Sequence, residues 1–246
     1  MILVLGGTAE ARALADRLDQ AGVAVTTSLA GRVSNPRLPR GHVRIGGFGG
    51  PEPFAAWLRS DGIEAVVDAT HPFAARISMS AAHACPAAGV PLLRLERPGW
   101  TEQPGDRWTR VGSLDQAASH VRGGGGRVLL TTGRGGLAAF AGVSDCWFLI
   151  RCVERPDPPL PPRHRLLLDR GPYTLAAELE LIDAHRIEVL VTKDSGGVMT
   201  EPKLEAARER GIPVIVVERP QRPDVETVTT VQEALFWARA AAGMSP

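Results

Sequence analysis

Short apolar runs alternate with helical patterns along the first part of the chain. The runs predict strands at residues 2–5, 23–29, 42–45, 63–69 and 90–95. Uninterrupted runs of this kind are typical of strands buried on both faces of a parallel sheet. Apolar residues on one helical face predict a helix after the first strand, through Ala11, Leu14, Ala15 and Leu18, and further helices at 51–60 and 72–88. This alternation indicates right-handed βαβ units.

The same alternation restarts after residues 98–108, which are rich in Pro, Gly and Trp and are predicted to be a linker. Beyond it, strands are predicted at 127–130, 146–153, 166–168, 188–191 and 214–217, and helices at 114–121, 173–184, 200–209 and 231–242. We therefore expect an α/β protein of two doubly wound domains with parallel sheets, residues 1–98 and 99–246, with a cleft between them.

Composition narrows the possible functions. Of the 246 residues, 44% are hydrophobic and 22% are charged, as in an ordinary globular protein. The formal net charge of +1 and an aromatic content of 5% argue against a nucleic-acid partner. No apolar run is long enough to span a bilayer and no basic leader precedes the first strand, so we expect a cytoplasmic protein without a membrane partner. Three cysteines without a CxxC pair, and no HExxH, predict no metal site.

The turn after the first predicted strand is a candidate phosphate site. Gly6-Gly7-Thr8-Ala9 lies between that strand and the first helix. Glycines there let a phosphate approach the backbone, and the helix N-terminus adds N–H groups and a partial positive charge. The motif is not a full GxGxxG, so an ordinary tight turn is the alternative.

The end of the second strand bears on the choice of cofactor. NAD enzymes place an acidic residue there for the ribose 2′-hydroxyl. This chain has Ser28 and Arg32 instead, and an arginine suits a 2′-phosphate because it donates two parallel hydrogen bonds. The sequence therefore predicts NADPH rather than NADH, with Arg32 as a solvated loop residue the alternative.

Thr70 and His71 follow the fourth predicted strand, in the segment Asp68-Ala-Thr-His-Pro-Phe73. We place both beside the cofactor. The alternative is structural: either residue would cap the next helix, with Pro72 at its first position. We assign no catalytic residue.

Two strand ends in the second half carry cations. Arg134 follows the strand at 127–130, and Lys193-Asp194-Ser195-Gly196-Gly197 follows the strand at 188–191. With Arg219 near another strand end, they supply positive charge, hydroxyl groups and backbone N–H groups suited to a polyanionic substrate. The alternative is two ordinary turns, with Asp194 paired to Lys193 or Arg134 on the surface.

An ordered set of motifs carries a family resemblance over nearly the whole chain. It comprises Gly6–Arg12, Asp68–Ala74, Glu96-Arg-Pro98 with Trp100, Thr132-Gly-Arg134, Thr192–Gly197 and Glu218-Arg-Pro220. In these motifs the chain resembles the precorrin-6A reductase family of cobalamin (vitamin B12) biosynthesis. The resemblance implies two Rossmann-like domains, an active site between them, and NADPH-dependent reduction of the C18–C19 double bond of precorrin-6A, giving precorrin-6B.

Other functions remain open at this stage. The substrate is either metal-free precorrin-6A or its cobalt complex. A non-catalytic module that binds a tetrapyrrole or a nucleotide would keep the charged segments. A transferase would use the glycine turn for another nucleotide, although the missing acid on the second strand disfavours S-adenosylmethionine. The oligomeric state is undetermined, with a monomer favoured.

Overall fold

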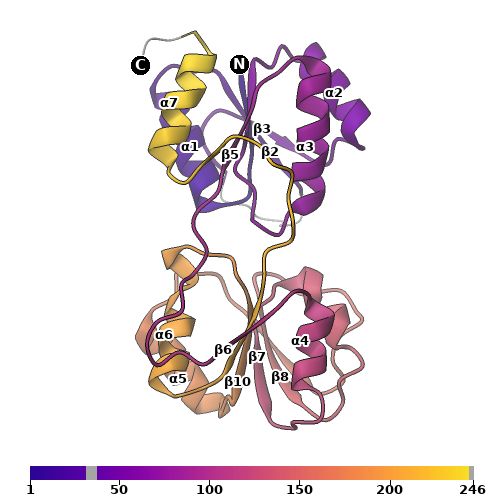
Figure 1. The fold of residues 1–246 in the computed structure, drawn as a ribbon, viewed down its shortest axis with the longest axis vertical. Coiled ribbons are helices and arrows are strands. Elements are labelled where there is room, and N and C mark those ends of the chain that lie inside the picture. Colours follow the sequence, from indigo (N-terminus) through magenta and orange to yellow (C-terminus); the bar gives the residue numbers. More distant parts are fainter. Residues whose placement is uncertain (32–37, 244–246) are drawn as a thin grey trace. The chain divides into compact units, whose positions relative to one another are not determined.

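The computed structural model describes residues 1–31 and 38–243. The chain divides into two compact units, Met1–Pro98 with Pro220–Pro246, and Gly99–Arg219 (Figure 1). The first unit contains β1 (Ile2–Leu5), α1 (Ala9–Gln20), β2 (Val25–Leu29), β3 (His42–Ile45), α2 (Pro51–Ser60), β4 (Ala65–Asp68), α3 (Ala75–Ala88), β5 (Leu92–Leu95), β12 (Thr227–Val228) and α7 (Val231–Ala241). The second contains β6 (Trp108–Val111), α4 (Leu114–Val121), β7 (Arg127–Leu130), the 3₁₀ helix η1 (Arg134–Phe140), β8 (Trp147–Cys152), β9 (His164–Leu168), α5 (Leu175–His185), β10 (Val189–Lys193), the 3₁₀ helix η2 (Val198–Thr200), α6 (Pro202–Glu209) and β11 (Val214–Val217).

Each unit is built on one six-stranded parallel sheet. The strand orders are β12-β5-β4-β1-β2-β3 and β6-β11-β10-β7-β8-β9. Each sheet is doubly wound: from the central strand, β1 or β7, the chain adds two strands on one side and then continues on the other side, and β6 is the one strand that precedes its central strand. In the first unit α1 and α7 cover one face of the sheet and α2 and α3 the other (Figure 1). The prediction of two parallel doubly wound α/β sheets is confirmed.

The central strands are buried as their apolar runs predict. All four residues of β1 are at most 1% exposed. Helix α1 places its apolar stripe, Leu14 and Leu18 among it, against the same sheet. Apolar burial on both faces of the sheet, at roughly 25 cal/mol per Å², fixes these layers. The strand ends that follow are thereby held in place.

In each unit, one edge strand comes from a segment that has just left the other unit. After β5 the chain runs through Glu96-Arg97-Pro98 into the second unit, where β6 pairs with β11. After β11 it runs through Glu218-Arg219-Pro220 back to the first unit, where β12 pairs with β5.

Two sequence predictions differ from this arrangement. Residues 220–246 were expected in the second domain, but β12 pairs in the first sheet and α7 packs on α1. Residues 98–108 were expected to be a linker, but Trp100 is buried in the second unit's core and Trp108 begins β6. Local patterning shows where a strand lies, and the choice between two similar sheets is made by long-range contacts.

The predicted start of α3 is also wrong. The helix begins at Ala75, and Pro72 and Phe73 lie in a turn before it. The Thr70 hydroxyl donates to Asp68 Oδ1 at 2.6 Å, and His71 Nδ1 accepts from the Phe73 N–H at 3.2 Å. Neither side chain therefore caps α3.

Candidate functional site

In the first unit the candidate site lies where the winding of the sheet reverses, between β1 and β4. Ligands of open parallel sheets bind at the carboxyl ends of strands beside such a point. Gly6 and Gly7 follow β1 there and play different roles. A Cβ on Gly6 would lie 2.8 Å from the Thr27 side chain, whereas one on Gly7 would meet nothing within 4 Å. Gly7 has a φ of 114° and is exposed, so its backbone is open to a ligand.

Thr8 links the carboxyl end of β1 to the carboxyl end of β4. Its hydroxyl donates to the Ala69 carbonyl at 2.7 Å and accepts from the Ala11 N–H at 3.0 Å, so it caps α1. Ala9 is the first residue of that helix. Thr8 and Thr70 line one small hollow together with Glu96 and Arg97. The structure thus brings the predicted residues at 6–9 and 70–71 to one edge of the first sheet.

Beneath this edge lies a buried cluster of charges. Arg222 donates to Asp68 Oδ2 at 2.9 Å, to Glu96 Oε2 at 2.9 Å and to the Ser78 hydroxyl at 2.6 Å. The Arg222 and Asp68 side chains are 5% and 1% exposed. Arg94 completes the cluster, and burial, then the nearby Arg222 charge, lowers its pKa. Asp68 therefore anchors the returning segment at Arg222.

Beside the end of β2 lies Arg44, a residue of β3 that the sequence did not single out. Ser28 is buried, and its hydroxyl accepts from Arg44 Nη1 at 3.4 Å. Arg32, the expected partner of Ser28, lies outside the described residues. A signal for Arg44 was present, because β3 is the next strand and ends at the same edge.

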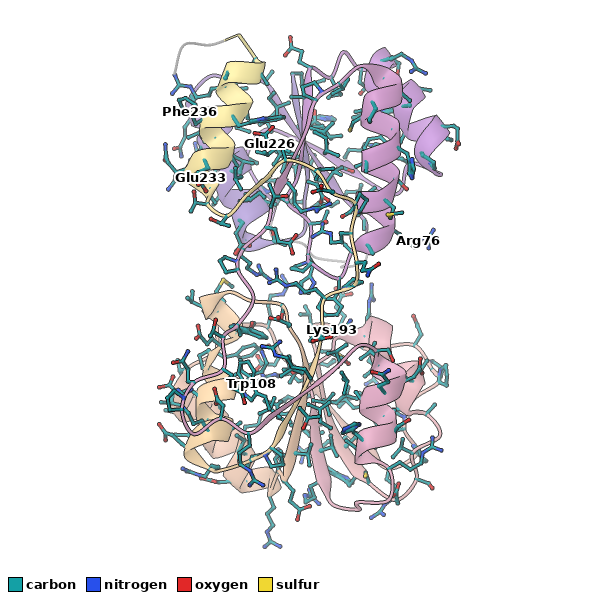
Figure 2. The ribbon with its side chains drawn as sticks, viewed as in Figure 1. Arg76, Trp108, Lys193, Glu226, Glu233 and Phe236 are labelled. Carbon is teal, nitrogen blue, oxygen red and sulfur yellow. The ribbon has the colours of Figure 1, made fainter. Side chains whose placement is uncertain are left out.

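The second unit repeats the reversal of winding between β7 and β10. Arg134 follows β7, and Lys193 ends β10, where Figure 2 labels it. The turn at Ser195, Gly196 and Gly197 comes next, and both glycines have positive φ. Trp100 holds this turn by donating from its indole N–H to the Gly197 carbonyl at 3.4 Å. The predicted cationic segments therefore lie on neighbouring strands at one edge.

Asp194 and Arg219 complete this edge. The Asp194 carboxylate accepts from the Trp100 N–H at 3.0 Å and lies 3.6 Å from Arg110. Arg219 Nε donates to the Asp194 carbonyl at 3.0 Å. Arg134 lies 3.6 Å from Glu154 in a half-exposed ion pair. Asp194 thus serves mainly to fix the turn, and the alternative pairing with Arg134 is replaced by one with Glu154.

Among the described residues there is no group of three or more His, Cys, Asp or Glu side chains that would hold a metal ion. All three cysteines are buried, and burial raises the pKa of each thiol, to about 12 for Cys85. They are inert residues of the interior. No helix in the described part of the chain has the length and apolar character needed to cross a bilayer.

Comparison with known proteins decides the family. The sequence matches the family described as precorrin-6x reductase CbiJ/CobK over residues 1–239. The chain belongs to this family. Its members are oxidoreductases of cobalamin biosynthesis, which agrees with the resemblance carried by the sequence motifs.

Individual relatives match over nearly their whole length. A precorrin-6A reductase from Rhodococcus erythropolis is 51% identical over 96% of both chains. A cobalt-precorrin-6A reductase from Priestia megaterium is 31% identical over 96% of both. The solved structure of a CobK precorrin-6A reductase superposes with a TM-score of 0.93 at 40% identity, covering 100% of this chain and 98% of the other.

Proposed function

We propose that this protein reduces precorrin-6A to precorrin-6B at the C18–C19 double bond, with NADPH as reductant. The observation that carries the proposal is that one chain of this family has two different sheet edges. The first unit has a glycine turn that is open at Gly7, and the second has a cationic edge at Arg134 and Lys193. The 51% identity to a precorrin-6A reductase, against 31% to a cobalt-precorrin-6A reductase, favours the metal-free substrate.

The first unit is proposed to hold the cofactor. The room above Gly7 and the N-terminus of α1 fit a diphosphate, which Gly6, Gly7, Thr8 and Ala9 would hold through backbone N–H groups. Thr70 and His71 stand at the neighbouring strand end. Because His71 Nδ1 accepts a hydrogen bond, its Nε2 carries the ring proton and is the donor. NADPH, when bound, supplies the hydride.

The second unit is proposed to hold the substrate. Precorrin-6A carries several acetate and propionate groups, and Arg134, Lys193 and Arg219 supply positive charge on adjoining strands. The turn at Ser195, Gly196 and Gly197 adds backbone N–H groups. These residues orient the macrocycle and keep water from its reacting face. The proton that completes the reduction comes from solvent or a substrate carboxylate, so the proposal requires no catalytic side chain.

The test is an anaerobic reaction of purified protein with precorrin-6A and NADPH. We expect loss of NADPH absorbance and a product heavier by two hydrogen atoms, with one deuterium incorporated when the transferable hydrogen of NADPH is labelled. Cobalt-precorrin-6A and NADH serve as the matched comparisons. Binding of precorrin-6A without turnover would replace the proposal with a non-catalytic tetrapyrrole-binding module. Faster turnover of the cobalt complex would reassign the substrate.

A further inference from the structure

Arg44 is held rigidly at the carboxyl end of β3. Its Nη1 donates to the Gly46 carbonyl at 2.7 Å and its Nη2 to the Gly47 carbonyl at 2.8 Å. The guanidinium lies 3.9 Å from the ring centre of Phe48, in a cation–π contact. The two hydrogen bonds and the cation–π contact together fix the orientation of the planar guanidinium group. Little rotamer entropy then remains to be lost when a ligand binds.

The charge on Arg44 is not neutralised by its protein contacts. The partners described for the guanidinium are two carbonyl oxygens, the Ser28 hydroxyl and aromatic rings, all uncharged. Within residues 1–31 and 38–243, Arg44 makes no ion pair with a carboxylate. Four N–H bonds lie on its two Nη atoms and one on Nε, and three of these five reach described acceptors. A fixed cation with remaining donors suits an anionic ligand.

The place of Arg44 in the sheet identifies that ligand. Ser28 and Arg44 are direct partners in the register of β2 and β3. In doubly wound sheets with a phosphate turn after the first strand, the end of the second strand lies beside the adenosine ribose. The glycine turn follows β1, which is hydrogen-bonded to β2. A phosphate on the ribose 2′-oxygen would therefore meet Ser28 and Arg44 together.

We infer that Arg44, with Ser28, binds the 2′-phosphate of the cofactor and makes the protein prefer NADPH to NADH. The inference rests on the proposed function, because it assumes a nicotinamide dinucleotide at this edge. It moves the determinant of specificity from Arg32 to a residue on the following strand. Phe48 and the Gly46-Gly47 turn act as positioning elements, because they hold the guanidinium in place.

The test is direct binding, measured by calorimetry with 2′,5′-ADP and 5′-AMP as probes, which differ only in the 2′-phosphate. The variants are Arg44→Met, which keeps an apolar stem over Phe48, Arg44→Lys and Ser28→Ala. Arg59→Met is the matched control, since Arg59 is an arginine of the same unit that also donates to a backbone carbonyl, that of Ala87. Thermal unfolding of each variant shows whether the unit stays folded.

We expect the wild type to bind 2′,5′-ADP more tightly than 5′-AMP. Arg44→Met should weaken 2′,5′-ADP binding about ten- to a hundredfold, the loss of a charged hydrogen-bonded contact, and leave 5′-AMP binding unchanged. Arg44→Lys should retain part of the preference because it keeps the charge. Ser28→Ala should cost a few-fold with 2′,5′-ADP only, and Arg59→Met should change neither affinity.

Three results would overturn the inference. Equal weakening of both probes by Arg44→Met would show a purely structural arginine. An unchanged preference would place the determinant elsewhere, and equal binding of NADPH and NADH by the wild type would show that no determinant exists. In all three cases the reductase assignment stands if the wild type turns over with precorrin-6A. Failure of the wild type to bind any dinucleotide would instead remove the proposed function, and this inference with it.

Discussion

The two sheets correspond strand by strand, and their differences lie at the carboxyl edges. Position for position, β4 of the first unit matches β10 of the second, and the edge strands β12 and β6 also match. Asp68 is the last residue of β4, and Asp194 directly follows β10. Each binds a segment that enters from the other unit and leads to, or lies in, the edge strand. Matching positions in the two sheets therefore have the same anchoring role.

The partners of the two aspartates differ in burial. Asp68 pairs with Arg222, whose side chain is 5% exposed, whereas the Arg110 side chain beside Asp194 is 37% exposed. Removing one member of a buried ion pair leaves an uncompensated charge, but an exposed pair is largely replaced by water. The same fold position thus carries very different amounts of stability in the two units.

The largest expected effect is the loss of the buried anchor. Arg222→Met should lower the free energy of unfolding of the first unit by about 3–5 kcal/mol, because Asp68 and Glu96 lose a hydrogen-bonded partner and keep only the more distant Arg94. The matched Arg110→Met change should cost about 0–1 kcal/mol in the second unit. Hydrogen exchange reports each unit separately and is the measurement of choice. Similar losses from both variants would contradict the argument from burial.

The second prediction distinguishes the proposed substrate edge of the second unit from the proposed cofactor edge of the first. Lys193→Ala should raise the KM for precorrin-6A by roughly ten- to a hundredfold, as expected for loss of a charged contact, with little change in the Kd for NADPH. Gly7→Ala should do the reverse, because an alanine at the Gly7 φ of 114° would be strained and would distort the turn proposed to hold the cofactor. Steady-state kinetics and NADPH titration measure the two constants. If Lys193→Ala weakened NADPH binding instead, the cofactor would belong to the second unit.

The third prediction compares two threonines, Thr8 after β1 and Thr132 after β7. Thr8→Val removes a helix cap and the bond to the Ala69 carbonyl, so it should cost about 1–2 kcal/mol of stability. The buried Thr132 hydroxyl makes no hydrogen bond with the described residues, so Thr132→Val should be neutral or slightly stabilising. Urea unfolding midpoints compare the two. A large loss from Thr132→Val would reveal an acceptor that this structure lacks.

The smallest effect concerns the helices that follow the edge strands. On α7, Thr230 and Glu233 form a reciprocal cap, whereas on α4 the Ser113 hydroxyl accepts from the Gln116 N–H and Gln116 Oε1 accepts from the Gly112 N–H. Hydrogen bonds from Thr230 hold the pKa of Glu233 below its usual value of 4.5. A lowered carboxyl pKa stabilises the fold above the unfolded value and is lost as pH falls through the folded one.

Glu233→Gln should therefore be slightly less stable than the wild type at neutral pH, and the difference should shrink as the pH is lowered past about 4.5. Gln116 does not titrate, so Gln116→Ala should give a stability difference that does not depend on pH. Thermal unfolding across an acidic pH series tests both. A difference for Glu233→Gln that stays constant with pH would rule out the carboxylate as the source of the effect.

The sequence by itself was sufficient for the two parallel sheets and for the turns at their carboxyl edges. Burial on both faces of β1 or β10 requires an uninterrupted apolar run, and the turn that follows must lie at the carboxyl end. The apolar run and the turn after it are local properties, so they can be recognised from a single segment of the sequence. The family motifs were visible for the same reason, because each is a short turn beside a strand.

Tertiary structure alone decided which sheet each edge strand joins and which partner each polar side chain meets. Arg222 reaches Asp68 across 154 residues, and no local pattern predicts such a pairing. Arg44 meets Ser28 only because β3 pairs with β2 in a particular register. Two sheets of the same topology offer nearly equal sites for an edge strand. The choice between them therefore depends on buried charges and packing that form only when the chain has returned on itself.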